Sequence, residues 1–155
     1  SLSDESAIGV IGKQGGSVVI NAKDINLVSS LIKGGTFLSS GEANSQSGNI
    51  TFNATGTIDL DSSNINNSTE IGNAGNININ AKSLNFSNNA KIDNNTFGVG
   101  NAGNISIKAT DTVSLNTGGI SLFCQSRSKP WFLVGWNDVN SSNCSKVTQE
   151  GYLAM

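Results

Sequence analysis

The chain has 155 residues, 36% of them hydrophobic and only 13% charged, and its formal net charge is −2. It contains no histidine, which excludes imidazole-based catalysis and histidine metal sites. It shows no basic footprint for nucleic acid, no signal-like opening segment and no apolar run near the roughly 18 residues of a membrane span, so neither nucleic-acid binding nor membrane insertion is expected.

A composition boundary follows residue 123. Arg, Pro, Cys, Trp, Tyr and Met are all absent from residues 1–123 and confined to 124–155. Across the chain, small polar residues and glycine are abundant where charged residues are few: there are 23 Asn, 23 Ser and 18 Gly. We therefore interpret 1–123 and 124–155 as two parts with different organisation.

The first part contains an internal repeat of about 28 residues. The motif Gly, any residue, apolar, any residue, apolar, any residue, Ala occurs four times, at spacings of 32, 27 and 28. Period-two alternation predicts a strand in each copy. These strands span residues 16–22, 48–54, 75–81 and 103–109.

Each copy continues in the same way. An apolar-x-apolar pair predicts a second strand, and a single apolar position further on marks a third. The pairs are Ile25 with Leu27, Ile58 with Leu60, Leu84 with Phe86, and Val113 with Leu115; the single positions are Ile32, Ile65, Ile92 and Ile120.

Three short strands cannot bury their apolar stripe alone, whereas stacked copies bury it together. The sequence therefore predicts an all-β fold, a parallel β-helix of about four coils, with Asn, Ser, Thr, Lys and Asp facing outward. Gly and Asn suit the corners because both tolerate a left-handed backbone. The side chains expected inside one coil are Ile77, Ile79, Ala81, Leu84, Phe86 and Ile92.

The segment GNAGNININAKSLNFSNNAKIDNNTFGVGNAGNISIKA, residues 72–109, resembles the passenger repeats of filamentous-haemagglutinin-like exoproteins. The resemblance covers about residues 9–123 and combines the GNAGNIxI start, the SLxF continuation and the TFGxGNAGN corner. It implies a right-handed β-helix, exported by two-partner secretion through an outer-membrane transporter and acting in adhesion at the bacterial surface.

Two features depart from that family. The first is that the NPNG-like motifs of its secretion domain do not occur; together with a start at Ser1 without Met, this leads us to expect an interior piece of a longer protein. Residues 124–155 leave the repeat pattern; they either cap the solenoid with the apolar run 131–136 or represent a reading-frame slip or truncated end. Whether Cys124 and Cys144 form a disulfide stays open.

Four patterns are candidates for chemistry. GVGNAG at 98–103 matches a dinucleotide-binding motif, but the strand pattern that follows opposes it, because the motif requires a helix. Asp59 and Asp61 face outward from one strand, and solvated surface acids are favoured over a calcium site. Phe37 and Phe97 are expected to pack over the coil edge. The loop at 38–47 is the longest variable loop; a solvated polar loop is favoured there over a binding decoration.

No catalytic, cofactor-binding or metal residue is expected. The function we expect is that of a non-enzymatic structural or adhesive segment of a large secreted surface exoprotein, located outside the cell. Its expected partners are the outer-membrane transporter, for the full-length protein, and glycans or surface proteins of host or neighbouring cells. The alternative is a fragment of a β-helical carbohydrate-active enzyme such as a polysaccharide lyase.

Overall fold

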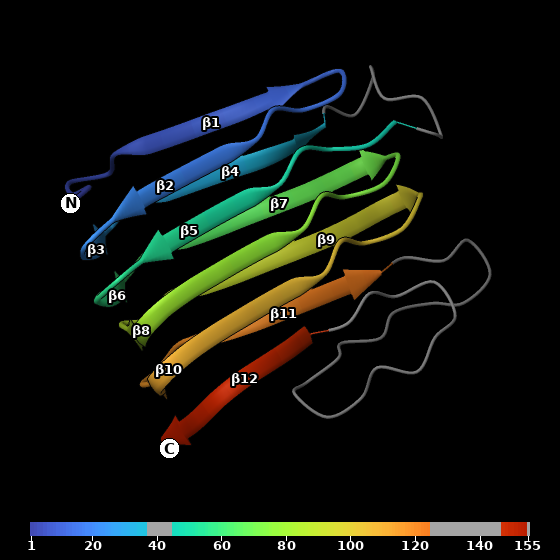
Figure 1. Ribbon diagram of the computed structural model, residues 1–155. Coiled ribbons are helices and arrows are strands. Elements are labelled where there is room, and N and C mark those ends of the chain that lie inside the picture. The colour runs from blue at the N-terminus through green and yellow to red at the C-terminus, as the bar shows by residue number, and fades with distance from the viewer. Residues whose placement is uncertain (37–44, 125–146, 155) are drawn as a thin grey trace.

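The computed structural model describes residues 1–36, 45–124 and 147–154. Within these ranges every regular element is a β-strand, as expected, and none is a helix long and apolar enough to cross a membrane. The strands, labelled in Figure 1, are β1 (Ala7–Gly12), β2 (Val18–Ala22), β3 (Ile25–Val28), β4 (Leu31–Thr36), β5 (Ile50–Ala54), β6 (Thr57–Asp61), β7 (Asn64–Ile71), β8 (Ile77–Ser87), β9 (Lys91–Val99), β10 (Ile105–Leu115), β11 (Gly119–Cys124) and β12 (Val147–Ala154).

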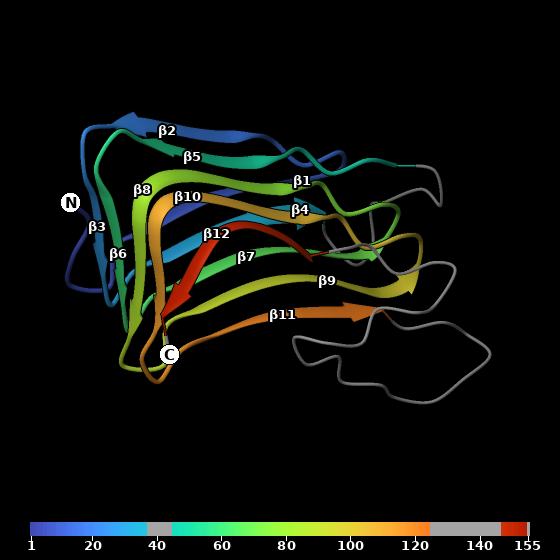
Figure 2. The same cartoon turned by 60° about the horizontal axis from the view of Figure 1, so that its bottom comes forward.

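The paired strands run parallel to one another. One sheet has the order β1-β4-β7-β9-β11, and the other has the order β12-β10-β8-β5-β2. The short strands β3 and β6 pair with each other, and β6 also pairs with the second half of β8. Figure 2 shows the two sets of strands as separate sides of one stack. Strands that are neighbours in a sheet therefore belong to successive coils.

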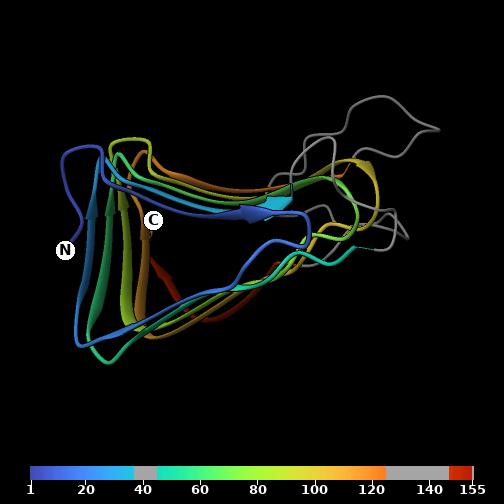
Figure 3. The same cartoon turned by 90° about the horizontal axis from the view of Figure 1, so that it is seen from above.

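Each coil has three sides, as the repeat predicts. The first complete coil uses β2, β3 and β4, and the next uses β5, β6 and β7. In the later coils β8 and β10 bend to supply two sides each, and β9 and β11 supply the third. Seen along the stack, the outline narrows away from the side formed by β3 and β6 (Figure 3). The fold is a right-handed parallel β-helix of about four turns.

Equivalent apolar side chains form columns through the stack. Ile32 lies in register with Ile65, and Ile65 with Ile92; all three are 0% exposed. The column continues to Ile8 at one end and Ile120 at the other. Burying each of these side chains contributes about 1.5–3 kcal/mol. The predicted interior set is buried as expected: Ile77, Ile79, Ala81, Leu84, Phe86 and Ile92.

A left-handed residue turns the chain between the second and third sides of every coil. The four residues occupy equivalent positions, and their φ angles lie between 47° and 64°. Asn at one of them agrees with the sequence prediction, whereas Ser and Thr at the others were not foreseen. They are Ser29, Ser62, Asn89 and Thr117; in the coil of β8 and β9 the preceding residue, Asn88, is left-handed as well, with a φ of 50°.

The prediction that Asn and Thr face outward is wrong at the narrow side of the coil. Four such side chains are at most 1% exposed: Asn67, Thr69, Asn94 and Thr96. Each continues the inward alternation that begins at Ile65 or Ile92, so strand geometry turns it toward the core whatever its polarity.

Hydrogen bonds compensate the burial of these groups except at Oδ1 of Asn94, which has no partner among the described residues. Nδ2 of Asn67 donates to the carbonyl oxygen of Gly48 at 3.0 Å, and Nδ2 of Asn94 donates to that of Gly75 at 3.0 Å. The hydroxyl oxygens of Thr69 and Thr96 lie 3.3 Å apart. The asparagine bonds therefore join the third side of the coil to the corner before the first strand, and the threonine contact joins two neighbouring strands of one sheet.

The stack continues across the composition boundary after residue 123. Strand β11 ends at Cys124, and β12 pairs in parallel with β10, with Val147 beside Ile105 and Leu153 beside Val113. Residues 147–154 thus add a strand to the sheet from within the segment that composition set apart. The apolar run 131–136 and Cys144 lie outside the described residues, so the cap, the frame slip and the disulfide stay predictions.

Candidate functional site: a polar groove at the glycine–asparagine corner

The repeat glycine brings successive coils close together at the corner before each first strand. A Cβ added at Gly75 would overlap the carbonyl oxygen of Gly48, and one at Gly103 would overlap that of Gly75. A Cβ at Gly48 would in turn meet the backbone of Gly16. Only glycine permits this approach of backbone to backbone. The glycine of the repeat is therefore a steric requirement of stacking.

The asparagine after each glycine fixes the coil spacing. Oδ1 of Asn49 accepts a hydrogen bond from the backbone N–H of Asn76 at 2.8 Å, and Oδ1 of Asn76 accepts one from Asn104 at 2.8 Å. At the start of the column, the hydroxyl oxygen of Ser17 accepts one from the N–H of Asn49 at 3.2 Å. One side-chain oxygen in each coil thus satisfies a corner N–H of the next coil.

A second column of asparagines stands beside the first. Oδ1 of Asn73 accepts a hydrogen bond of 2.9 Å from the N–H of Asn101, and Gln46 pairs with Asn73 in a parallel bridge. The side chain of Gln46 donates from Nε2 to the carbonyl oxygen of Ala74 at 3.0 Å. This column therefore also links each coil to the next.

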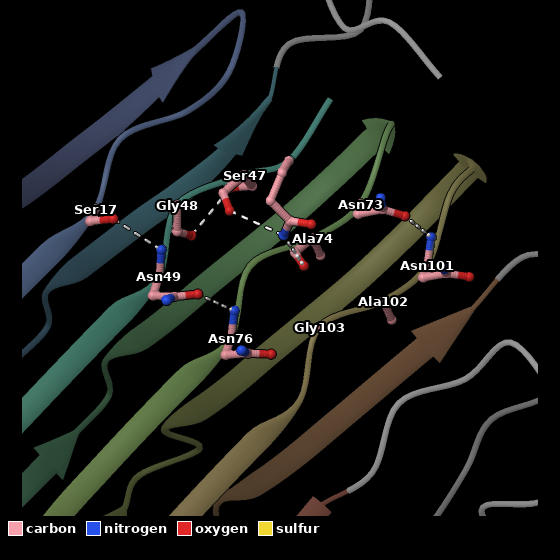
Figure 4. A pocket seen from close by; sticks show the side chains of 11 residues that line it. Ser17, Ser47, Gly48, Asn49, Asn73, Ala74, Asn76, Asn101, Ala102 and Gly103 are labelled. Carbon is pink, nitrogen blue, oxygen red and sulfur yellow. Dashed lines mark hydrogen bonds between the residues drawn. The ribbon is translucent and has the colours of Figure 1, made fainter. Parts of the chain in front are cut away.

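The two columns border a shallow groove of about 490 Å³. Figure 4 shows Asn49 and Asn76 on one side of it, Asn73 and Asn101 on the other, and small residues between them. The lining carries no ionisable side chain, so the groove is polar and neutral. Its residues are Ser17, Gln46, Ser47, Gly48, Asn49, Asn73, Ala74, Asn76, Asn101, Ala102 and Gly103.

The groove offers hydrogen-bond donors to a ligand. The Oδ1 atoms of Asn49, Asn73 and Asn76 are already engaged by backbone N–H groups. Among the described residues, no protein group bonds the Nδ2 atoms of these three side chains, and each can donate two hydrogen bonds. The arrangement suits a neutral ligand rich in oxygen acceptors.

Asp59 and Asp61 lie side by side on β6, as predicted, and each is bonded to the next coil. Nδ2 of Asn85 donates to Oδ1 of Asp59 at 2.7 Å, and Nδ2 of Asn88 donates to Oδ1 of Asp61 at 2.7 Å. No group of three or more acidic, His or Cys side chains is positioned for a metal ion among the described residues. The two carboxylates support stacking, and their environment is that of surface acids.

The GVGNAG segment at 98–103 spans the end of β9 and the corner before β10. The element after it is the strand Ile105–Leu115 rather than a helix. Since the dinucleotide motif places pyrophosphate on a helix N-terminus, this segment lacks the required geometry. Its last glycine belongs instead to the corner column.

The phenylalanine side chains fall into two groups, buried and half-exposed. Phe52 and Phe86 point inward and are 0% and 1% exposed, in agreement with the alternation. Phe97 is 47% exposed, so about half of its surface is open to solvent, and its packing over the coil edge stays a prediction. Phe37 lies outside the described residues.

The loop at 38–47 is described only from residue 45. Its last two residues, Gln46 and Ser47, line the groove, so the described end of this loop, which the sequence favours as a solvated polar loop, reaches the candidate site. Sequence reasoning missed the groove itself. The available signal was the repeated pair of asparagines in GNAGN at 72–76 and 100–104, which becomes two columns once the coils stack.

Fold and site together define a right-handed parallel β-helix with a neutral, amide-lined groove along one corner. Comparisons with protein-family models, with curated proteins and with solved structures find no match to this chain.

Proposed function

We propose that this chain is a non-enzymatic structural and adhesive segment of a large bacterial exoprotein of the filamentous-haemagglutinin-like kind, exported through an outer-membrane transporter. The observation that carries the proposal is that the outward-facing polar groups serve coil stacking. Nδ2 of Asn53 donates to Oδ1 of Asn21 at 2.8 Å, and Nδ2 of Asn80 donates to Oδ1 of Asn53 at 2.8 Å. Such ladders stiffen a rod that presents its loops at a distance.

The acidic pair supports the same proposal over the enzyme alternative. The carboxylates of Asp59 and Asp61 each accept a hydrogen bond from an asparagine one coil away. A lyase that uses clustered acids for calcium would need those oxygens for the ion, because calcium takes six to eight oxygen ligands. The site chemistry therefore favours a structural role for the pair.

Adhesion is tested with beads that carry the purified chain. We expect the beads to be retained on epithelial or bacterial cell layers more strongly than beads carrying the same chain after irreversible unfolding. Equal retention of both bead types would contradict an adhesive role. A coding sequence on either side that lacks further GNAGN-type repeats would contradict membership of a long repeat array.

Catalysis is tested separately with acidic polysaccharides and Ca²⁺. We expect no turnover of pectate, alginate or hyaluronate. Turnover that is abolished by Asp59→Asn or Asp61→Asn would replace this proposal with the lyase alternative. Both substitutions keep an oxygen that can accept the asparagine hydrogen bond, so they change the charge without breaking the stack.

A further inference from the structure

The geometry points to the corner groove as a binding site for a neutral, linear polysaccharide that runs along the stack axis. This inference rests on the proposed adhesive function and names the ligand class of one surface. The groove combines unengaged amide donors, a small-residue floor and a fixed repeat along its length. Each of these properties restricts the class of ligand.

The donors require a ligand with many oxygen acceptors. The Nδ2 groups of Asn49 and Asn76 border one side of the groove, and those of Asn73 and Asn101 border the other (Figure 4). Hydroxyl, ring and glycosidic oxygens of a sugar chain can all accept such bonds. A metal cation is a poor occupant because the amide oxygens of Asn49, Asn73 and Asn76 are bound to backbone N–H groups.

The neutral lining selects against charged chains. No Lys or Arg lines the groove, and strong recognition of sulfate, phosphate or carboxylate groups ordinarily uses charge-assisted bonds from those residues. An acidic glycan would lose the water around its anions without gaining such a partner. An uncharged glycan avoids that cost.

The floor admits a sugar ring. Ala74 and Ala102 lie between the two asparagine columns together with Gly48 and Gly103. Both alanines are 4% exposed, so they form a shallow surface close to the backbone. Because these side chains are small and buried, a ring can approach the backbone of the corner closely.

The spacing matches an extended sugar chain better than an extended peptide. Successive coils are about 4.8 Å apart, the separation of neighbouring strands in a sheet. That step is close to the length of one sugar residue in an extended glycan. An extended peptide advances only about 3.3 Å per residue, so its carbonyl groups fall out of step with the coils. The proposed ligand therefore brings a sugar residue near each coil, with successive residues of a β-1,4-linked chain presenting different oxygen atoms to the groove.

The test compares Asn76→Asp with Asn78→Asp in the full chain. Both variants add one negative charge to the same coil. Asn76→Asp keeps the oxygen that accepts the N–H of Asn104 but removes the groove donor. Asn78 lies on β8 outside the groove lining. The probes are cellohexaose, chitohexaose and laminarihexaose as neutral chains, with a heparin hexasaccharide as the charged comparison. Binding is followed from the side-chain amide signals in ¹⁵N NMR titrations.

We expect at least one neutral hexasaccharide to bind with a dissociation constant in the range of about 1 mM or tighter and to shift the amide signals of Asn49, Asn73 or Asn76. Asn76→Asp should weaken binding about tenfold, the effect of losing one hydrogen bond of ordinary strength. Asn78→Asp should leave it within about twofold, well below that loss. Thermal unfolding of both variants checks that the stack is intact.

Three outcomes would overturn the inference: saturation by none of the neutral chains, preference for heparin, or equal weakening by both variants. Its failure is distinguishable from failure of the proposed function. If the beads adhere to cells but the chain binds no hexasaccharide, the adhesive function is supported and the groove is excluded as its binding site. Cleavage of a bound hexasaccharide would keep the groove and remove the non-enzymatic proposal.

Discussion

The hydroxyl of Ser47 lies 3.2 Å from Oδ1 of Asn67 and donates a hydrogen bond to it inside the coil. In the following coil Ala74 stands where Ser47 stands, and Asn94 stands where Asn67 stands. Oδ1 of Asn94 is buried and has no hydrogen-bond partner. A single change from Ser to Ala between two repeats thus leaves one buried acceptor unsatisfied.

Ser47→Ala should destabilise the chain by about 1–3 kcal/mol, because it leaves Oδ1 of Asn67 buried without a donor. Ala74→Ser should have the opposite sign and stabilise by about 0.5–1.5 kcal/mol, because it supplies Asn94 with the missing donor. Chemical denaturation of both variants measures the difference in the free energy of unfolding.

Ala102→Ser is the matched control for Ala74→Ser. It adds the same hydroxyl one coil further on, where the register partner of Asn94 is Leu122, a residue type without a hydrogen-bond acceptor in its side chain. We expect no gain in stability. Stabilisation by Ala102→Ser equal to that by Ala74→Ser would show that Asn94 is not the reason.

Gly75→Ala should destabilise by about 3 kcal/mol, the upper end of ordinary overpacking, because its Cβ would overlap the carbonyl oxygen of Gly48. Gly9→Ala on β1 makes the same chemical change where a Cβ would have no atom within 4 Å, and we expect it to be neutral or slightly stabilising. The melting temperatures of the two variants give the comparison. A loss of the same size in both would mean that the corner contact is not the cause.

The sequence contained enough information to predict the apolar columns but not the polar interior. The burial of Ile65 and Ile92 is predictable from the sequence, because both are apolar and alternate with polar neighbours. Asn67 and Asn94 share the same parity, yet an interpretation by residue type places them outside. Their burial depends on acceptors such as the carbonyl oxygen of Gly48, which lies across the coil and 19 residues away in the chain. Partners of that kind are not visible in a local pattern.

Thr117→Asn should stabilise the chain by about 0.5–1 kcal/mol, a part of the cost of about 1–2 kcal/mol that a left-handed conformation imposes on most L-residues. Thr117 has a φ of 57°, and the equivalent position one coil earlier already carries Asn89, with a φ of 64°. The reverse substitution, Asn89→Thr, should destabilise by a similar amount. Calorimetric unfolding tests both; a pair of shifts with the same sign would contradict the argument.

Val19→Lys should reduce association between copies of this chain. Val19 is 60% exposed on β2, which is the end strand of its sheet in the described structure, and an apolar edge strand recruits other strands unless a charge prevents it. Thr51→Lys is the control, because Thr51 pairs with Val19 but lies on β5, which is paired on both sides. Light scattering should show less association for Val19→Lys alone. Equal effects of both lysines would point to net charge instead.

The candidate groove could not be predicted from the sequence either, because it too depends on contacts between coils. The motif GNAGN shows two asparagines per repeat, but their alignment into two columns needs the register of Asn73 with Asn101 and of Asn49 with Asn76. That register follows from the close glycine contacts at the corner. Only the stacked structure shows that the amide oxygens face the next coil and leave the amide nitrogens unengaged.

The parallel register of the coils is the central claim, and disulfide trapping tests it most directly. In a chain with Cys124→Ser and Cys144→Ser, the pair Asn53→Cys and Asn80→Cys places two cysteines on register partners of adjacent coils, about 4.8 Å apart and within the range that a disulfide can span. The pair Asn53→Cys and Asn78→Cys faces the same way but is displaced by two residues. Mild oxidation should cross-link the first pair rapidly and the second hardly at all, as read by mass spectrometry. Equal rates, or faster cross-linking of the displaced pair, would contradict the stack.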